Sequence, residues 1–267
     1  MFGCPHGAKW TARSFVEEAL ANGAEMINFA KVDRVIVENN RAVGLEYRLK
    51  SRRQKVYASQ VVIAAGGIGS PLILRNSGFK GVGQDFFFDP LWFVYGTVKG
   101  GSGNGVQMCA GIHFEDEGIL MTDYNLNPKV KASLDCQVFR VDQAINFANV
   151  VPIMVKVRDG LGGRITDSGW VWKPLKALDK HKLKLGRKHA RRILKNMGAG
   201  EIYNSWLLAS HPGGTVKIGA HLDEQLQTRI KNLYVCDCSV MPEELGLPPT
   251  LTLLSLGKRL ARHLLAQ

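Results

Sequence analysis

The stretch QVVIAAGGIGSPLILRNSG, residues 60–78, decides how this chain folds. Its apolar residues 61–63 predict a short buried strand, and the run of glycines that begins at Gly66 is expected to end this strand before a short helix at residues 71–75. A glycine-rich turn after a strand is weak support for a nucleotide site, because many parallel sheets need small residues there. The segments on either side are therefore needed to interpret it.

The residues before this stretch predict a helix followed by a β-meander. Residues 11–23 read TARSFVEEALANG, with a threonine at the start, two early glutamates and Asn-Gly as a stop, which is typical of a short helix. The alternating runs MINFAKVDRVIVENN, RAVGLEYRL and QKVYAS follow between residues 26 and 59. Asn39-Asn40 and a basic turn separate these runs, so we expect three antiparallel strands.

The residues after this stretch predict a second type of architecture. From about residue 87 the strand-like runs LWFVYGTV, GVQMCAGIHF, GILMTDYNL, NVVPIMVKVR and GRITDSGWVW indicate a mainly antiparallel sheet, covered by one or two basic amphipathic helices at residues 173–198. Residues 230–238 predict another apolar strand, and residues 249–267 a final amphipathic helix. The fold class is therefore α/β plus α+β. No strand followed by G-x-G-x-x-G and a later acidic residue opens the chain.

Composition excludes several classes of protein. The chain has 267 residues and no apolar run of about eighteen residues, so we expect no membrane span, and no secretory signal is visible at its start. Its five cysteines form an odd set without the spacing of a metal site, which favours reduced thiols, a cytoplasmic location and no bound metal.

The net charge of +12 is concentrated in residues 173–198, where Asp179 is the one acid. Their apolar positions keep a helical spacing, so we interpret the charge as the solvated face of a helix. An anionic partner, a membrane surface or a nucleic acid is the alternative, but no aromatic interleaving or known reader motif accompanies the charge. We therefore predict no nucleic-acid partner.

Five segments, placed in order, resemble the glucose–methanol–choline (GMC) flavin oxidoreductases. The order of helix, meander, apolar strand and Gly-Gly turn is how many flavoproteins close the sheet that holds the dinucleotide. The resemblance covers residues 1–90 and 200–267 and is faint in between. The segments that carry it are GCPHGAKWTARSFV, VVIAAGGIGSPLILRNSGF, GVGQDFFFDP, HPGGTVKIG and NLYVCDCSVMPEELGLPPTLTLLSLGKRLARHL. In the third of these, Asp85 and Asp89 lie in the frame of the family's V-G-x-N-L-x-D-H-P, but the usual Asn-Leu and His are replaced.

This resemblance implies an FAD-dependent enzyme that oxidises the CH–OH group of a small alcohol-type donor by hydride transfer to the flavin. It implies that residues 1–88 and 200–267 form a Rossmann-like FAD-binding domain from both chain ends, with residues 89–199 as an inserted substrate-binding domain. Two rival hypotheses are a non-catalytic remnant or partner-dependent subunit of a split flavoprotein, and a basic nucleic-acid-binding protein.

The resemblance also assigns the general base. Residues 210–219 read SHPGGTVKIG, which is either an ordinary tight turn or a histidine held against a flat ring that the backbone must approach closely. In the family this histidine faces the isoalloxazine ring, and hydride transfer leaves a hydroxyl proton to be removed. A free imidazole titrates at about pH 6.5 and suits that task. We predict that His211 is the base.

The residues expected to contact the cofactor follow from the same comparison. Two have simpler interpretations: Asp237 as the cap of a strand end, and Val32 as an ordinary valine of the meander. Cys238 replaces a usual glycine or alanine, where simple tolerance of the larger side chain or a redox role is possible. The full set is Val32, Gly66, Asp237, Cys238, Pro249 and Thr250.

Two departures from the family pattern stand out. Pro248 occupies the position of the second catalytic Asn or His, and a proline has neither a side-chain donor nor a backbone N–H. A water or another side chain takes over that work, or the substrate is not a simple alcohol. The second departure is the missing dinucleotide motif, which predicts that an N-terminal flavin-domain segment or subunit completes the site.

Overall fold

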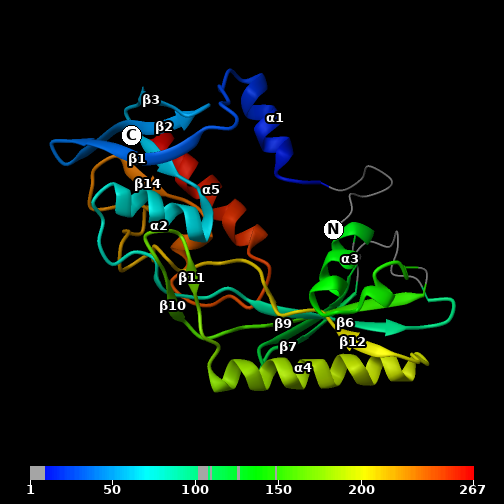
Figure 1. Ribbon diagram of the computed structural model, residues 1–267. Coiled ribbons are helices and arrows are strands. Elements are labelled where there is room, and N and C mark those ends of the chain that lie inside the picture. Colours follow the sequence, from blue (N-terminus) through cyan, green and yellow to red (C-terminus); the bar gives the residue numbers. More distant parts are fainter. Residues whose placement is uncertain (1–9, 102–107, 109, 125–126, 148) are drawn as a thin grey trace. The chain divides into compact units, whose positions relative to one another are not determined.

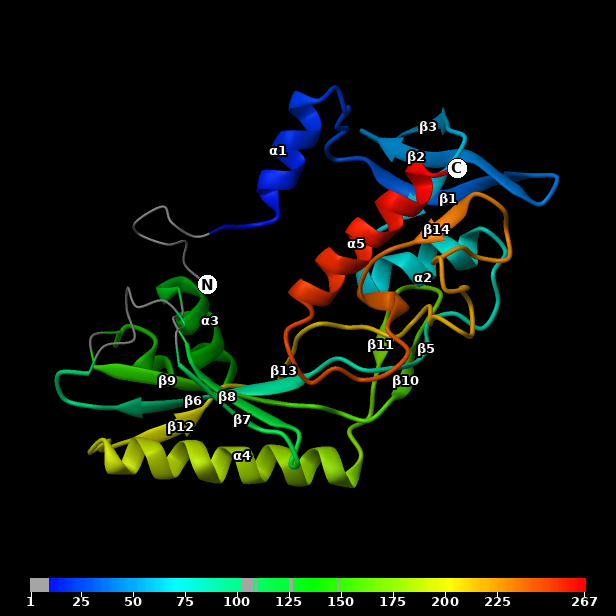
Figure 2. The same cartoon turned by 180° about the vertical axis from the view of Figure 1, so that it is seen from behind.

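A computed structural model describes residues 10–101, 108, 110–124, 127–147 and 149–267 (Figures 1 and 2). The fold is mixed α/β with antiparallel sheets. Most of the GCPHGAKW motif lies outside the described residues, as do Cys4 and Cys109. The chain divides into two compact units: unit 1 comprises Met1–Asn28, Pro90–Val157 and Ala177–Leu208, and unit 2 comprises Phe29–Asp89, Arg158–Lys176 and Ala209–Gln267.

Unit 1 is built on an antiparallel sheet whose strands follow the order β12-β6-β9-β8-β7, with β13 paired to β6. Its helical elements are α1 (Arg13–Ala21), α3 (Pro128–Gln137), the 3₁₀ helix η1 (Val141–Gln143) and α4 (Ala177–Asn196). Its strands are β6 (Pro90–Thr97), β7 (Gly111–Phe114), β8 (Ile119–Asp123), β9 (Val150–Val157), β12 (Ile202–Asn204) and β13 (Leu208–Ala209), the last of which ends just beyond the unit.

Helices cover both faces of this sheet, with α3 on one side and α4 on the other (Figures 1 and 2). Phe93 and Tyr95 of β6 share a core with Leu134 of α3. On the α4 face, a Cβ at Gly186 would collide with side chains of β9 and β8, so the helix can pack this closely only with glycine at that position.

The basic segment folds as the single helix α4. Four of its buried residues, Leu183, Gly186, Ala190 and Leu194, recur at helical spacing and form the face toward the sheet. The exposed cations lie on the remaining surface: Lys180, Lys184, Lys188, Arg192 and Lys195. This is the exposed basic face that the sequence predicts. None of the helices in the described part of the chain is long and apolar enough to cross a membrane.

Unit 2 contains three small sheets: the antiparallel meander β1-β2-β3, the antiparallel set β11-β10-β5, and the parallel pair β14-β4. Its strands are β1 (Lys31–Glu38), β2 (Arg41–Leu49), β3 (Arg52–Tyr57), β4 (Val61–Ile63), β5 (Gln84–Phe86), β10 (Gly162–Ile165), β11 (Val171–Trp172) and β14 (Leu233–Val235). Its helical elements are α2 (Gly66–Asn76), the 3₁₀ helix η2 (Cys238–Val240) and α5 (Thr250–Leu265).

One hydrophobic core joins the early residues (29–89) and the late residues (209–267) of unit 2. Leu74 of α2, Leu233 of β14 and Leu260 of α5 are buried in the same cluster. β14 lies parallel to β4, with Leu233 opposite Val61. Residues from early and late in the chain therefore fold around a shared interior.

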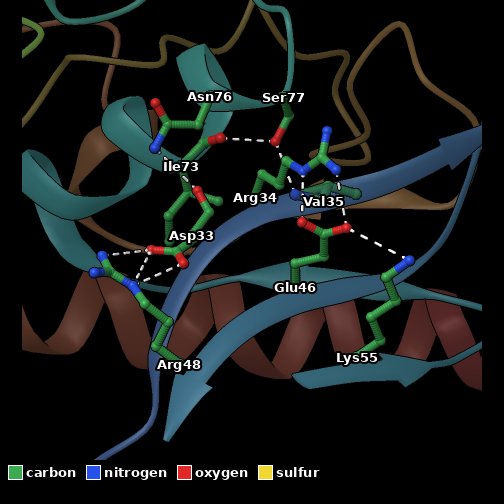
Figure 3. Close-up of polar contacts among 9 residues, drawn as sticks. All are labelled: Asp33, Arg34, Val35, Glu46, Arg48, Lys55, Ile73, Asn76 and Ser77. Atoms are coloured by element: carbon green, nitrogen blue, oxygen red, sulfur yellow. Dashed lines mark hydrogen bonds and ion pairs between the residues drawn. The ribbon is translucent and has the colours of Figure 1, made fainter. Parts of the chain in front are cut away.

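The meander is attached to the end of α2 by specific hydrogen bonds (Figure 3). The Asn76 side chain donates to the carbonyl of Asp33 at 3.0 Å, and the Val35 N–H donates to the Ser77 hydroxyl at 2.8 Å. The same hydroxyl donates to the carbonyl of Ile73 at 2.7 Å. The same view shows three exposed ion pairs between the strands of the meander: Arg34–Glu46, Arg48–Asp33 and Lys55–Glu46. Such exposed pairs add little stability.

The glycine run after β4 differs from the prediction. Helix α2 begins at Gly66 and includes the following glycines, rather than starting near Pro71 after a separate turn. A Cβ at Gly67 would collide with the carbonyl of Pro212, so the helix can approach the 210–219 segment this closely only with a glycine there. These glycines therefore serve the packing of a helix.

The run at residues 163–172 also differs from the prediction of one central sheet. It forms the β10–β11 hairpin, and β10 pairs with β5, with Gly162 opposite Phe86. Arg75 of α2 strengthens this attachment by donating to the carbonyl of Ile165. Residues 158–176 therefore group with unit 2, whereas the rest of the predicted 89–199 domain from Pro90 onward groups with unit 1.

Candidate active site

The segment 210–219 is fixed by backbone hydrogen bonds on two sides. On one side Phe87 and Gly213 exchange both of their N–H···O bonds at 3.0 Å. On the other side the Gly214 N–H donates to the carbonyl of Cys238 at 3.1 Å, and the Val216 N–H donates to that of Ser239 at 2.8 Å. Three stretches that are distant in sequence thus form one rigid layer.

The glycines of this segment are required by that packing. A Cβ at Gly213 would lie within 2.5 Å of the Phe87 ring and 2.7 Å of the Cys238 sulfur. Gly214 has a φ of +79°, which side-chain-bearing residues rarely adopt. The backbone therefore approaches its neighbours more closely than an alanine would allow.

His211 stands at the start of this layer, beside a buried carboxylate. Its Nδ1 atom lies 3.1 Å from Oδ2 of Asp89 and 3.3 Å from the Ser210 hydroxyl. The His211 side chain is 31% exposed, whereas the Asp89 side chain is completely buried. A histidine whose Nδ1 donates to a carboxylate keeps Nε2 as the acceptor of its neutral ring.

Asp89 is held in turn by a second buried pair that the sequence analysis missed. Oδ1 of Asp159 accepts the N–H groups of Asp89 at 2.9 Å and Phe88 at 3.2 Å. Lys173 Nζ lies 3.1 Å from Oδ2 of Asp159 and donates to the carbonyl of Phe86 at 2.7 Å. Burial raises the pKa of Asp159, and the Lys173 charge opposes this shift. The one sequence signal was an isolated acid in Arg-Asp-Gly at residues 158–160.

Asp237 acts as a structural cap in this arrangement. Its carboxylate accepts the N–H of Gly66 at 2.9 Å, the hydroxyl of Ser70 at 2.5 Å and the N–H of Ser239 at 2.7 Å. These bonds tie the first turn of α2 to η2. Asp237 therefore caps the start of η2 and the first turn of α2, rather than the end of a strand, and Gly66 is in direct contact with it.

Cys238 contacts the backbone of His211 and is a neutral thiol. It is buried, and its sulfur is 3.8 Å from the carbonyl oxygen of His211, to which the thiol donates. Burial, together with the charges of Asp237 and Asp89, raises the pKa of Cys238 to about 12. A thiol with such a pKa forms almost no thiolate at neutral pH, which favours a packing role over a redox role.

We expect Cys238 to resist alkylation in the folded chain. At pH 7.5 iodoacetamide should label the exposed Cys136 well before Cys238, because only the thiolate reacts. Peptide mass spectrometry of the native protein, with a denatured sample as the control, measures this order. Labelling of Cys238 at the rate of Cys136 would show that the thiol is accessible and ionised.

The start of α5 offers hydrogen-bond donors. Pro249 is the N-cap residue and is buried, Thr250 and Leu251 are exposed, and no side chain caps this helix. The first N–H groups of a helix have no partner within it and carry a partial positive charge. Pro248, also exposed, precedes this turn and adds no donor of its own.

The structure brings together some of the predicted residues. Cys238 contacts His211, and Gly66 contacts Asp237. Val32 lies in β1 opposite Tyr47, next to a break in the strand register. Within the described ranges, no hydrogen bond links Val32, Pro249 or Thr250 to His211, Asp89 or Cys238. The same ranges hold no group of three side chains that could bind a metal ion.

Comparison with known proteins defines the class. Family models of GMC oxidoreductases match residues 1–91 and 158–257, which together are more than half of the chain. The chain therefore belongs to the GMC oxidoreductase family. Members of this family are flavoproteins, and FAD is the cofactor that the class implies.

Individual relatives cover nearly all of the chain. It is 26% identical over 265 residues to the uncharacterized protein MJ1450 of Methanocaldococcus jannaschii, covering 97% of this chain and 65% of that protein. It is 20% identical over 331 residues to the long-chain-alcohol oxidase FAO3 of Arabidopsis thaliana, covering 95% of this chain and 44% of that protein. The chain thus spans about half the length of the curated relatives it matches.

Two solved structures share the fold. The pyridoxine 4-oxidase from Mesorbium loti superposes with a TM-score of 0.64 at 15% identity, covering 89% of this chain and 57% of that one. An FAD-dependent oxidoreductase from Chaetomium thermophilum superposes with a TM-score of 0.61 at 15% identity, covering 94% of this chain and 63% of that one. At these identities the likeness defines the fold alone.

The described residues fit one end of FAD better than the other. The N–H groups at the start of α5 suit the polar edge of the flavin ring, which gains negative charge on reduction. At the start of α2, by contrast, the N–H groups of Ala65 and Gly66 are already bonded to Ser70 and Asp237. That helix end is therefore a poor site for the pyrophosphate.

Proposed function

We propose that this chain forms the catalytic part of an FAD-dependent oxidoreductase that acts on the CH–OH group of a small alcohol-type donor. The observation that carries the proposal is the contact of His211 with the buried Asp89, at the start of a glycine segment packed too tightly for any side chain. When bound, FAD supplies the acceptor for the hydride that leaves the substrate carbon.

His211 is the general base in this proposal. Its Nε2 accepts the proton of the substrate hydroxyl, while Nδ1 stays hydrogen-bonded to Asp89. The partial exposure of the ring leaves it accessible to a substrate, and the rigid layer behind it limits its motion. Proton removal by a positioned imidazole typically contributes about 10²- to 10⁴-fold to the rate.

Pro248 offers a substrate no hydrogen-bond donor. It cannot hydrogen-bond a hydroxyl or relay a proton, so His211 carries the proton transfer without help from this position. A water or another side chain fills the role that Asn or His has in the family pattern. The exposed sequence Leu247-Pro248 also stiffens the loop that leads to α5.

We propose that four residues line the cofactor, with Val32 on its adenine side: Val32, Gly66, Pro249 and Thr250.

The pyrophosphate of FAD needs donors from a glycine turn that opens a helix, and the sequence holds no G-x-G-x-x-G. In the described residues, β4 pairs only with β14, and its residue Val62 is 42% exposed. We propose that a segment carrying that motif completes the FAD-binding domain.

The test of this function is flavin reduction by substrate. The chain, loaded with FAD together with such a segment, is mixed without oxygen with a series of primary alcohols and the corresponding aldehydes. We expect the yellow absorbance of oxidised flavin to bleach with at least one alcohol and with none of the aldehydes. Failure of every alcohol to bleach a fully loaded preparation would contradict the proposal.

A further inference from the structure

We propose that Asp89 is a positioning residue, which holds His211 in the tautomer protonated at Nδ1 and thereby reserves Nε2 for the substrate. Neither the family comparison nor the sequence motif assigned it a role. The consequence for turnover rests on the proposed function, whereas the tautomer is a property of the chain itself. Oδ2 of the carboxylate lies 3.1 Å from Nδ1 of this ring.

Asp89 is built for this contact. It is completely buried and reaches the histidine from 122 positions away in the sequence. Burial of a carboxylate is costly unless it is hydrogen-bonded or paired, and an Nδ1–H donor supplies such a bond. The Ser210 hydroxyl is the competing partner of Nδ1, but at 3.3 Å it is farther away and also donates to the carbonyl of Asp89.

Both residues have an unusual backbone conformation. His211 has a φ of 53° and Asp89 a φ of 48°, in the left-handed region that is unfavourable for a non-glycine residue. Such conformations persist where the surrounding structure fixes them. Here they direct two side chains from separate segments at each other.

The Asp159–Lys173 pair fixes the backbone of Asp89. Asp159 accepts the N–H of Asp89, and Lys173 balances the charge of Asp159. Cys238, which contacts the backbone carbonyl of His211, is a neutral thiol at working pH. The Asp89 carboxylate is therefore placed to stabilise the positive ring that forms when His211 takes up a proton.

The first test reads the tautomer directly. The chain labelled with ¹⁵N-histidine, alone or with its complementing segment, is studied by NMR correlation of ring nitrogens and ring protons. The resonances of His211, one of seven histidines, are assigned by their loss in His211→Asn. We expect the pattern of a ring protonated at Nδ1 in the neutral state. A ring protonated at Nε2 would overturn the proposal, whether or not the protein oxidises alcohols.

The second test separates positioning from folding. Asp89→Asn keeps the shape of the side chain, and we expect it to lower kcat by about 10²-fold or more with little change in KM, because the ring loses its fixed tautomer. Ser210→Ala removes the competing contact and should leave kcat near the wild-type value. A full kcat in a folded Asp89→Asn protein, or an equal loss in Ser210→Ala, would refute the role. If Asp89→Asn does not fold, the wild-type NMR spectrum decides alone.

Discussion

Replacement of His211 by asparagine is expected to lower turnover by about 10²- to 10⁴-fold while the flavin stays bound, because the proton acceptor is removed and the hydride acceptor is not. Asparagine is the preferred substitution, since it tolerates the φ of 53° at this position better than alanine or glutamine does. The measurement compares kcat and the flavin content of wild type and variant.

His221 provides the matched control. It lies in the same unit, and burial lowers its pKa, so its ring is neutral at working pH and no proton transfer is assigned to it. His221→Gln should therefore keep its turnover. Unchanged turnover in a flavin-loaded His211→Asn protein would remove the general base from the mechanism and leave the class of reaction to be decided by the alcohol series.

The chain expressed alone is expected to purify without yellow colour and with low stability. Its sequence lacks the turn that binds a dinucleotide pyrophosphate, and the first turn of α2 is occupied by Asp237 and Ser70. Exposed apolar residues such as Leu251 and Leu265 of α5, at 78% and 89%, favour aggregation or a partner. Co-expression with a segment carrying G-x-G-x-x-G should restore colour and solubility.

The ratio of flavin absorbance to protein concentration measures this effect. The control is the same segment with the first glycine of its motif replaced by valine, which blocks the tight turn at the pyrophosphate but leaves the rest of the segment unchanged. Equal flavin content with both segments would show that the motif is not the missing element. Stoichiometric FAD in the chain alone would refute the proposal of a completing segment.

Local sequence signals were sufficient for most of the regular elements, but not for all of them. Asn39 and Asn40, both with positive φ, turn β1 into β2 as the Asn-Asn signal predicted, because asparagine tolerates this conformation. The apolar spacing of residues 175–197 likewise predicted a helix, α4; of these apolar residues Leu183 and Leu194 are buried, but Leu178 and Met197 are exposed. Helix α3 was missed, although Asn127 caps its first turn and a proline follows, since its apolar pattern is weak.

The motif resemblance singled out His211 and its glycine segment, yet it did not show why the glycines are needed. That reason lies in Phe87 and Cys238, which come from two other stretches of the chain. The same holds for Asp237, whose carboxylate accepts hydrogen bonds from Gly66 and Ser70, two residues that are distant from it in the sequence.

The sequence by itself determined most of the strands and helices and the family of this protein, because propensity, periodicity and short motifs act over a few neighbouring residues. Only the tertiary structure decided that Asp89 meets His211, that Asp159 and Lys173 support this contact, and that residues 158–176 pair with β5. An apolar face or an edge strand is compatible with many partners. The choice among them depends on how the whole core packs and on the cost of closing long loops, which no local pattern records.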